Sequence, residues 1–103
     1  MTFRIVIESP AKTDLSAAVR WYKHIQKGLE ADFRLCVRAS LHHIARHPES
    51  YPVVGRRLRR ALTSRFPFAI FYLLDGDIIR VFGVLHTSRS PLVWQARDQQ
   101  RMT

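Results

Sequence analysis

The order of the hydrophobic patterns along the chain predicts an α+β fold in which a helical hairpin packs on a small antiparallel sheet. One short β-branched run comes first, two stretches of helical periodicity follow it, and three strand-like runs come after them. The sequence has 103 residues, which is enough for one hydrophobic core and too short for two. We therefore expect residues 1–103 to form a single domain with an N-terminal strand, an antiparallel helical hairpin and a three-stranded antiparallel sheet.

The N-terminal half carries the strand and the hairpin. Residues 3–8 are short and β-branched, which is typical of a strand. Ser9 and Pro10 form the signature of a helix start, with Ser9 as the N-cap residue. Gly28 predicts a left-handed cap at the end of the first helix, and Pro48 ends the second helix. The short break at Gly28 predicts that the two helices run antiparallel.

Both predicted helices have an apolar face that can pack on a core. In the second helix a separate basic stripe runs at i, i+4 spacing, and we expect it to face water or a partner. We expect Trp21 and Tyr22 of the first helix to make core or hairpin contacts. Cys36 is the single cysteine, which excludes an internal disulfide and a Cys-based zinc site, and its helical position predicts an inert core thiol. The basic stripe consists of Arg34, Arg38, His42 and Arg46.

The C-terminal half contains three strand-like runs. Residues 57–62 form a short cationic run, and residues 66–74 are rich in aromatic side chains and Ile. A hairpin turn is predicted at Asp75-Gly76-Asp77, because glycine tolerates a positive φ. Residues 78–85 are almost wholly apolar, which is typical of a central strand that is covered on both faces. We expect residues 92–103 to form a tail or a short helix.

The charge of the chain is strongly basic and unevenly distributed. Seventeen Lys and Arg residues against eight Asp and Glu residues give a formal net charge of +9. The window 34–65 contains eight Arg and the single acid Glu49, so it supplies +7 of that excess. Arg favours planar, bidentate contact with phosphate or carboxylate groups. The sequence therefore predicts an anionic partner, which could be either a nucleic acid or an acidic protein.

Composition and motifs exclude several other classes of protein. An apolar fraction of 47% is too high for a disordered tail. No run approaches the roughly 18–20 apolar residues that a membrane span needs, and the N-terminus lacks the layout of a secretion signal, so we expect a cytoplasmic protein without membrane contact. No Gly-rich phosphate-binding motif is present, so no cofactor is expected. His42 and His43 point about 100° apart on a helix, with no acid one turn away, so no metal site is expected.

Short motifs also occur in a characteristic order along the chain. The N-terminal half contains Asp14-Leu15, Trp21-Tyr22, Ile44 with His47-Pro48, and Tyr51-Pro52. The C-terminal half contains the Arg-rich run 56–61, Arg65-Phe66-Pro67-Phe68, Phe71-Tyr72, Val84-Leu85-His86 and Arg89-Ser90-Pro91. Over roughly residues 3–97, their order and spacing resemble the toxins of the RelE/ParE superfamily from type II toxin–antitoxin modules.

The resemblance implies the fold, the role and the partners of the protein. Superfamily members fold as a helical hairpin on a small antiparallel sheet and are small basic growth inhibitors, often of plasmid-stabilisation modules. The resemblance implies that a cognate acidic antitoxin neutralises the protein and that operator DNA is contacted only through that antitoxin. It also implies one of two targets, because ParE-like members poison DNA gyrase, whereas RelE-like members cleave mRNA in the ribosome.

A RelE-like activity would require catalytic groups for metal-independent RNA cleavage, namely a base, an acid and cations at the phosphate. His86 at the end of the last strand could act as the acid or the base, and Arg59, Arg60 and Arg65 could supply the cations. RelE-like nucleases often carry a Tyr near the last strand, and here no Tyr follows Tyr72. The catalytic set is therefore incomplete, and a His86 that only bonds to a backbone carbonyl is the structural alternative.

A ParE-like activity would require a protein-binding surface with anchor residues and no acid–base pair. The run 80–86 looks closer to ParE-like toxins. A patch of Leu92, Val93 and Trp94 could serve as an anchor, although packing of this segment over the sheet accounts for the same residues. We expect a ParE-like gyrase poison, with a RelE-like ribosome-dependent mRNA endoribonuclease as the alternative. An inactive antitoxin-binding or nucleic-acid-binding module is the second alternative.

The Arg-rich strand and its surroundings form the predicted binding site for the antitoxin or for nucleic acid. Arginines at this place can pair with the carboxylates of an antitoxin segment or with phosphates. An antitoxin that covers this surface would also block a nuclease site there. The predicted binding residues are Arg56, Arg57, Arg59, Arg60 and Arg89.

Overall fold

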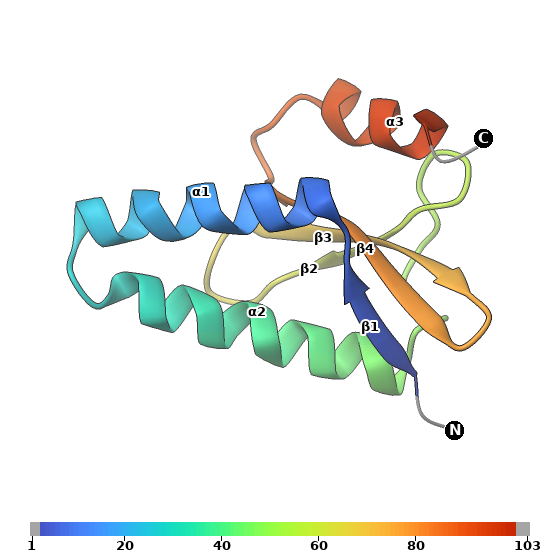
Figure 1. The fold of residues 1–103 in the computed structure, drawn as a ribbon, viewed down its shortest axis with the longest axis horizontal. Helices are drawn as coiled ribbons and strands as arrows, with labels where there is room; N and C mark the ends of the chain where they lie inside the picture. The colour runs from blue at the N-terminus through green and yellow to red at the C-terminus, as the bar shows by residue number, and fades with distance from the viewer. Residues whose placement is uncertain (1–2, 101–103) are drawn as a thin grey trace.

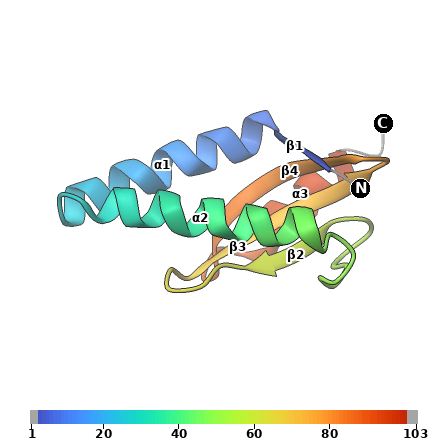
Figure 2. The ribbon, with the colours of Figure 1, turned by 90° about the horizontal axis from the view of Figure 1, so that it is seen from below.

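A four-stranded sheet lies between a helical hairpin on one face and a C-terminal helix on the other (Figure 1, Figure 2). This computed structural model describes residues 3–100 of the chain. The predicted α+β arrangement is confirmed, since a strand, a helical hairpin and three antiparallel strands follow one another. The elements are β1 (Arg4–Ile7), α1 (Ser9–Ile25), α2 (Leu29–Arg46), β2 (Arg59–Leu62), β3 (Phe68–Asp75), β4 (Ile78–His86) and α3 (Pro91–Gln100).

The sheet has the strand order β1-β4-β3-β2. The three strands β2, β3 and β4 pair antiparallel, and β3 and β4 occupy the centre, as their apolar sequences predict. β1 pairs with β4 in parallel, with Arg4 opposite Ile78, because the helical hairpin forms a crossover before the antiparallel strands begin. The predicted hairpin turn between β3 and β4 is confirmed, and Gly76 within it has a φ of 62°.

The helix boundaries follow the local sequence with two corrections. The prediction of Ser9 as the N-cap of α1 is wrong, because Glu8 occupies that position and Ser9 is the first helical residue. Glu8 stays extended because its N–H still donates to the Val81 carbonyl at 2.9 Å, which continues the pairing of β1 with β4. Pro10 lies in the first turn of α1 as predicted. Gly28 has the expected left-handed backbone, with a φ of 97°, but its predicted position at the end of α1 is wrong, because Gln26 is the C-cap of α1 and Gly28 is the N-cap of α2.

The core between the hairpin and the sheet is built around four aromatic rings. The ring centroids of Tyr22 in α1 and Phe33 in α2 are 5.2 Å apart, and that of Phe66 lies 5.0 Å from Tyr22. The ring of Phe68 in β3 lies 4.9 Å from Phe33. All four side chains are buried, and the rings meet at tilted or edge-to-face angles, which their quadrupoles favour. These contacts join both helices to the sheet.

The tryptophan next to this cluster points outward. The prediction of core or hairpin contacts is right for Tyr22 and wrong for Trp21, whose surface is 60% exposed. Adjacent residues on a helix point about 100° apart, so the burial of Tyr22 turns Trp21 towards solvent. Cys36 is buried as predicted, and its thiol donates to the carbonyl of Ser64 at 2.6 Å.

The opposite face of the sheet is covered by α3 and by the segment that precedes β2. Phe71, Phe82 and Leu85 are buried on this face. The ring of Trp94 in α3 stacks on Phe71, with centroids 5.3 Å apart and an interplanar angle of 18°. Packing of the C-terminal segment over the sheet is therefore confirmed for Trp94, whereas Leu92 is exposed.

Tyr72 connects β3 to the loop that follows α2. Its side chain is fully buried, and its hydroxyl donates to the carbonyl of Pro48 at 2.6 Å. Burial raises the pKa of Tyr72 to about 12, and the nearby Arg59 opposes this rise by a smaller amount. The neutral phenol is thus favoured in the folded protein.

The raised pKa of Tyr72 predicts a loss of stability at high pH. Its stabilising effect is complete below the unfolded-state pKa of about 10 and is lost as the pH rises towards about 12. The Tyr72→Phe variant has no phenol to ionise, so it should lose less stability than the unmodified chain as the pH rises. At neutral pH it should be about 1 kcal/mol less stable, because the Pro48 carbonyl loses its hydrogen-bond donor. Urea unfolding at pH 7 and pH 11 measures both effects. If the free energy of unfolding of the variant falls as much between pH 7 and pH 11 as that of the unmodified chain, the prediction is contradicted.

Candidate functional site

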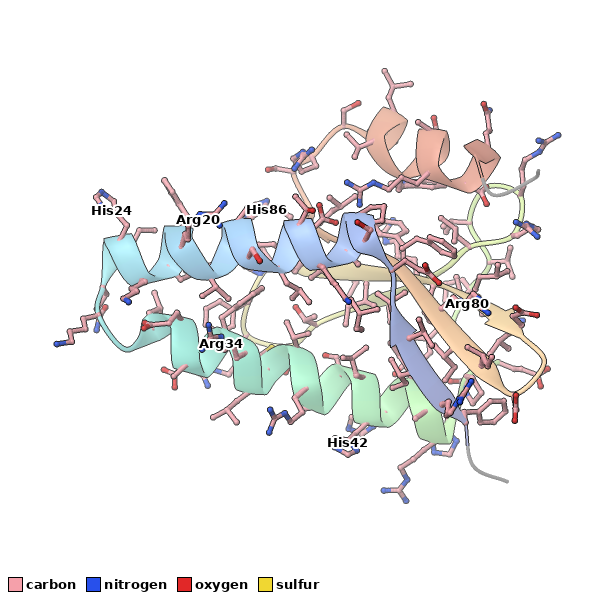
Figure 3. The ribbon with its side chains drawn as sticks, viewed as in Figure 1. Arg20, His24, Arg34, His42, Arg80 and His86 are labelled. Carbon is pink, nitrogen blue, oxygen red and sulfur yellow. The ribbon has the colours of Figure 1, made fainter. Side chains whose placement is uncertain are left out.

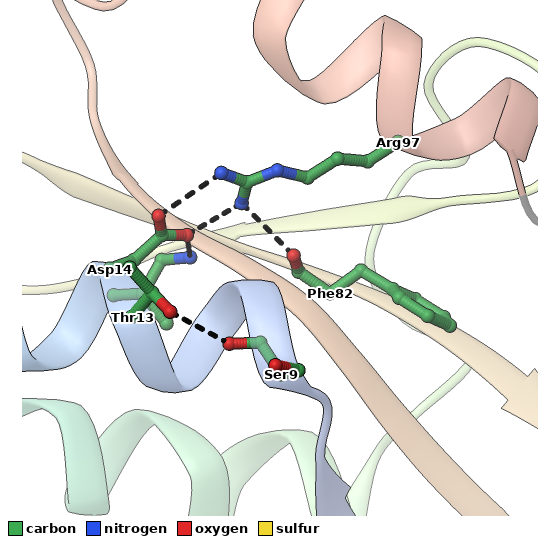
Figure 4. Close-up of polar contacts among 6 residues, drawn as sticks. Ser9, Thr13, Asp14, Phe82 and Arg97 are labelled. Atoms are coloured by element: carbon green, nitrogen blue, oxygen red, sulfur yellow. Dashed lines mark hydrogen bonds and ion pairs between the residues drawn. The ribbon is translucent and has the colours of Figure 1, made fainter.

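An ion pair between α1 and α3 fixes the C-terminal helix on the sheet (Figure 4). The guanidinium of Arg97 donates to both carboxylate oxygens of Asp14, at 2.6 and 3.1 Å. The same carboxylate accepts the backbone N–H of Val84 at 2.9 Å, and Arg97 also donates to the carbonyl of Phe82 at 3.0 Å. The side chains of Asp14 and Arg97 are only 9% and 19% exposed, so the pair is largely withdrawn from water. One carboxylate and one guanidinium thus join α1, β4 and α3.

A bulge in β4 makes room for this ion pair. The register between β3 and β4 shifts at Phe82, which is the extra residue between Val81 and Gly83. The Phe82 carbonyl accepts a hydrogen bond from Arg97 at this point. A Cβ atom at position 83 would lie 3.0 Å from the guanidinium of Arg97, so the glycine allows the side chain to approach the strand.

The next residue of α3 holds the loop before β2. Asp98 is only 2% exposed, and its carboxylate accepts the backbone N–H groups of Arg56 and Arg57 at 2.6 and 3.2 Å. Gly55 has a φ of 65°, and a Cβ atom there would lie 2.7 Å from Asp98 and 2.8 Å from Trp94. The loop can therefore close on α3 only with glycine at this position. The side chain of Arg56 is exposed, whereas Arg57 is half-buried.

Sequence reasoning did not assign a role to Arg97 or Asp98. Both lie in the segment that is expected to be a tail or a short helix. Asp98 is the only acidic residue after Asp77, and its isolation in a basic segment is the one signal that could have marked it. A lone carboxylate in a basic segment is typical of a group that stabilises the fold, either in an ion pair or as a hydrogen-bond acceptor.

Arg59 holds the loop that precedes its own strand. Its guanidinium donates to the backbone carbonyls of Glu49 and Tyr51, at 3.1 and 2.7 Å. These two bonds orient the side chain along the loop. In this conformation the guanidinium stabilises the backbone of the protein, and a phosphate would have to compete with both carbonyls for it.

His86 and Arg65, which are also predicted to take part in RNA cleavage, lie elsewhere. Arg59 pairs with Tyr72 of β3 and His86 pairs with Phe68, so the two positions are about 13 Å apart along the strand direction. Arg65 lies in the turn between β2 and β3 with a φ of 68°, and its guanidinium faces the first turn of α2. The sheet register therefore separates Arg59 from His86.

The ring of His86 has a defined orientation. Its Nδ1 accepts the backbone N–H of Ser88 at 3.0 Å, and the Ser88 hydroxyl lies 2.7 Å from the same atom. The backbone contact assigns the proton of the neutral ring to Nε2. The ring also packs edge-on against Phe68, with centroids 5.4 Å apart. The Nδ1 atom of His86 thus bonds to a backbone N–H, whereas the structural alternative to catalysis was a bond to a backbone carbonyl.

His86 lies in a groove of about 590 Å³ between α1, the end of β4 and α3, which we call the α1 groove (Figure 3). The small side chains of Ala17 and Ala18 form part of its α1 wall. The exposed ring of Trp21 and the guanidinium of Arg89 also line it. An aromatic ring and a cation in a concave site are typical anchors of a protein–protein interface.

A smaller pocket of about 80 Å³ opens on the face of the sheet that α3 covers, and we call it the α3 pocket. It brings together Arg60, Arg89 and His86. Two of the five predicted antitoxin-binding arginines therefore share one site. Neither this pocket nor the α1 groove is lined by Arg59 or Arg65.

Two other features are absent from residues 3–100. No three His, Cys, Asp or Glu side chains of this segment gather as ligands for a metal ion. None of its helices combines the length and the apolar character that a bilayer span requires.

Comparison with known proteins identifies the class and the family. A family model described as the ParE toxin of the type II toxin–antitoxin system parDE matches residues 5–91. A chain of the chromosomal ParDE TA system from P. aeruginosa has a similar fold, with a TM-score of 0.74 and 13% sequence identity. The similarity covers 82% of this chain and 96% of that chain. No curated protein matches the sequence.

The fold and these matches define a toxin of the RelE/ParE superfamily. Within it, the chain belongs to the family of ParE toxins of type II toxin–antitoxin systems. The family match ends at the first residue of α3, so Arg97 and Asp98 lie outside the matched segment.

The ion pair of Asp14 and Arg97 predicts a large effect of its removal. Asp14→Ala leaves the buried guanidinium of Arg97 and the N–H of Val84 without their acceptor, and we expect a loss of about 3 kcal/mol in the free energy of unfolding. Asp75→Ala is the matched control, because Asp75 is 58% exposed and pairs with Arg80, and its loss should stay below about 1 kcal/mol. Urea unfolding measures both. Equal losses would contradict the structural role of the buried pair.

Proposed function

We propose that the protein is a cytoplasmic, growth-inhibiting toxin that binds DNA gyrase and is neutralised by a cognate acidic antitoxin. Membership of the ParE toxin family supports the toxin role and the existence of an antitoxin. The observation that carries the choice of target is the α1 groove with its exposed Trp21. A poison that acts by binding a protein needs a shaped surface with anchor residues, and this groove has that character.

The arrangement of the arginines supports the same choice. Metal-independent RNA cleavage needs cations and an acid or base at one phosphate. Arg59 donates to two backbone carbonyls, and Arg65 lies outside both cavities that His86 lines. Arginines that lie this far from His86 are poorly placed to act with it on one phosphate. Their positions suit separate structural and binding roles better.

The RelE-like endoribonuclease is the second candidate, and one observation favours it. His86, Arg60 and Arg89 line the α3 pocket together, so an imidazole and two cations are close to each other. If the protein cleaves RNA, His86 would act as the acid or base there, with Arg60 and Arg89 as the phosphate-binding groups. Arg59 and Arg65 would then contribute from outside the pocket.

Induction of the protein in bacteria separates the candidates. We expect growth arrest with filamentation and DNA breaks, while mRNA stays intact. Early cuts in ribosome-bound mRNA at codon boundaries, abolished by His86→Ala, would overturn the gyrase proposal. Normal growth, together with antitoxin binding in vitro, would identify an inactive binding module.

The α1 groove predicts a specific loss of toxicity for Trp21→Ala. Because Trp21 is exposed, its removal should leave the folded state intact and raise survival after induction at least about tenfold. Leu35→Ala is the matched control, since Leu35 on α2 is 62% exposed and does not line the groove. Viable counts after induction, with circular dichroism of the purified variants, give the comparison. Full toxicity of Trp21→Ala would remove the groove as the target-binding surface.

The acidic antitoxin is proposed to contact the basic surface around β2. Arg60 and Arg89 share the α3 pocket, and the exposed Arg56 lies in the loop that α3 holds. Arg57 and Arg59 lie beside them in the same segment of the chain. Carboxylates of an extended antitoxin segment can pair with these guanidinium groups in bidentate geometry.

Charge reversal at Arg60 and Arg89 tests this contact. The Arg60→Glu/Arg89→Glu variant should bind the purified antitoxin at least about tenfold more weakly than the unmodified chain, because attraction becomes repulsion. Arg4→Glu/Lys27→Glu is the control, since it makes the same change of charge at exposed positions outside the pocket. Calorimetric titration measures both affinities. Equal losses for the two variants would indicate a general charge effect and contradict a local contact.

A further inference from the structure

The solvent side of α1 and the turn that follows it carry basic side chains and no acidic one. All of these basic side chains are exposed, and Figure 3 shows His24 on the side of α1 that faces away from α2. We call this surface the α1 ridge. Its members are Lys12, Arg20, Lys23, His24 and Lys27.

The positive charge of the α1 ridge is not neutralised within the described part of the chain. Asp14 is the single acid of α1, and it faces α3, where it binds Arg97 at 2.6 Å. Over residues 3–100 no side chain of the ridge takes part in an ion pair. The ridge therefore presents an uncompensated positive potential to an anionic partner.

The surface between these cations is polar. Thr13 and Ser16 lie exposed among them, and hydroxyl groups are frequent hydrogen-bond donors to phosphates. The two exposed large apolar side chains of α1, Trp21 and Ile25, lie one turn apart on the flank beside the α1 groove. Protein interfaces have a less charged centre, whereas interfaces with nucleic acids are polar and strongly positive. The composition of the ridge thus favours a nucleic acid over a polypeptide.

The length of the ridge suits a run of several phosphates. Lys12 and His24 are 12 positions apart, which corresponds to about 18 Å along the helix axis. One strand of B-DNA has a phosphate about every 3.4 Å along its axis, so about five phosphates fit beside the ridge. Lysine acts as a point charge without a fixed geometry, which suits contact with the backbone of any sequence.

We propose that the α1 ridge contacts the phosphate backbone of the DNA duplex that gyrase holds, while the α1 groove binds gyrase itself. This inference rests on the proposed gyrase-binding function. Thr13 and Ala17 of α1 line the groove, so the two surfaces adjoin on one helix and one DNA-loaded enzyme can contact both. The two contacts then reinforce each other, because the first raises the local concentration of the second. The operator DNA that the antitoxin contacts is a different duplex.

Binding of free duplex DNA tests the ridge without gyrase. The probe is a fluorescent duplex of about 20 base pairs, which is two helical turns. Each phosphate contact contributes about 0.9 to the slope of log affinity against log salt concentration, so Arg20→Gln/Lys23→Gln should reduce this slope by about 2. Glutamine is a good helix former, so the variant should keep α1 folded, which circular dichroism verifies. Fluorescence anisotropy at several salt concentrations measures the slope.

The matched control removes the same charge outside α1. Arg4→Gln/Arg46→Gln changes two exposed arginines on β1 and at the end of α2, and it should leave the slope unchanged. Equal slopes for the two variants would overturn the proposal, since the contact would then be a general charge effect. A preference of at least about tenfold for one duplex sequence would overturn it in favour of sequence readout. Tighter binding of poly-glutamate than of duplex, with the same dependence on Arg20 and Lys23, would overturn it in favour of an acidic protein.

Immobilised gyrase, with and without bound duplex, separates this inference from the proposed function. We expect the unmodified chain to bind the DNA-loaded enzyme at least about tenfold more tightly than the free enzyme. Arg20→Gln/Lys23→Gln should lose this difference and retain its affinity for free gyrase. A variant that keeps the full difference overturns the ridge contact and leaves the proposed function intact. If the unmodified chain binds gyrase in neither state, the proposed function fails, and the gyrase-held duplex fails with it as the partner of the ridge.

Discussion

The bidentate ion pair of Asp14 and Arg97 is the interaction on which the arrangement of the functional surfaces depends. It joins the first helix, the bulge of β4 and the last helix through one largely buried carboxylate. Both side chains also form part of the wall of the α1 groove. Without the pair, a charge would remain in a site with little access to water, so the position of α3 is strongly specified.

The next residue of α3 holds a second part of the structure in place. Asp98 binds two backbone N–H groups of the loop before β2, and Trp94 stacks on the sheet beside it. Consecutive side chains of one helix thus contribute to the wall of the α1 groove and hold the basic loop before β2. Pro91 and Trp94 of the same helix line the α3 pocket.

The basic residues of this ParE-family chain serve different purposes according to their surroundings. Arg59 and Arg97 donate to backbone carbonyls and stabilise the fold. Arg20, Arg34 and Arg38 of the helical hairpin lie at the surface instead, as do Arg60 and Arg89 of the α3 pocket. A net charge of +9 therefore does not describe one continuous anion-binding face. Its two surface clusters lie on opposite sides of the sheet.

The sequence by itself determined the helices, the strands, the left-handed Gly28 and the central position of β3 and β4, because periodicity and turn chemistry act over a few neighbouring residues. Only the tertiary structure decided the exposure of Trp21, the parallel pairing of β1 and the bulge at Phe82. It also decided the partners of Asp14 and Asp98, which lie 83 and 42 positions away along the chain. No local pattern encodes contacts across such separations, since they form only when packed elements bring the side chains together.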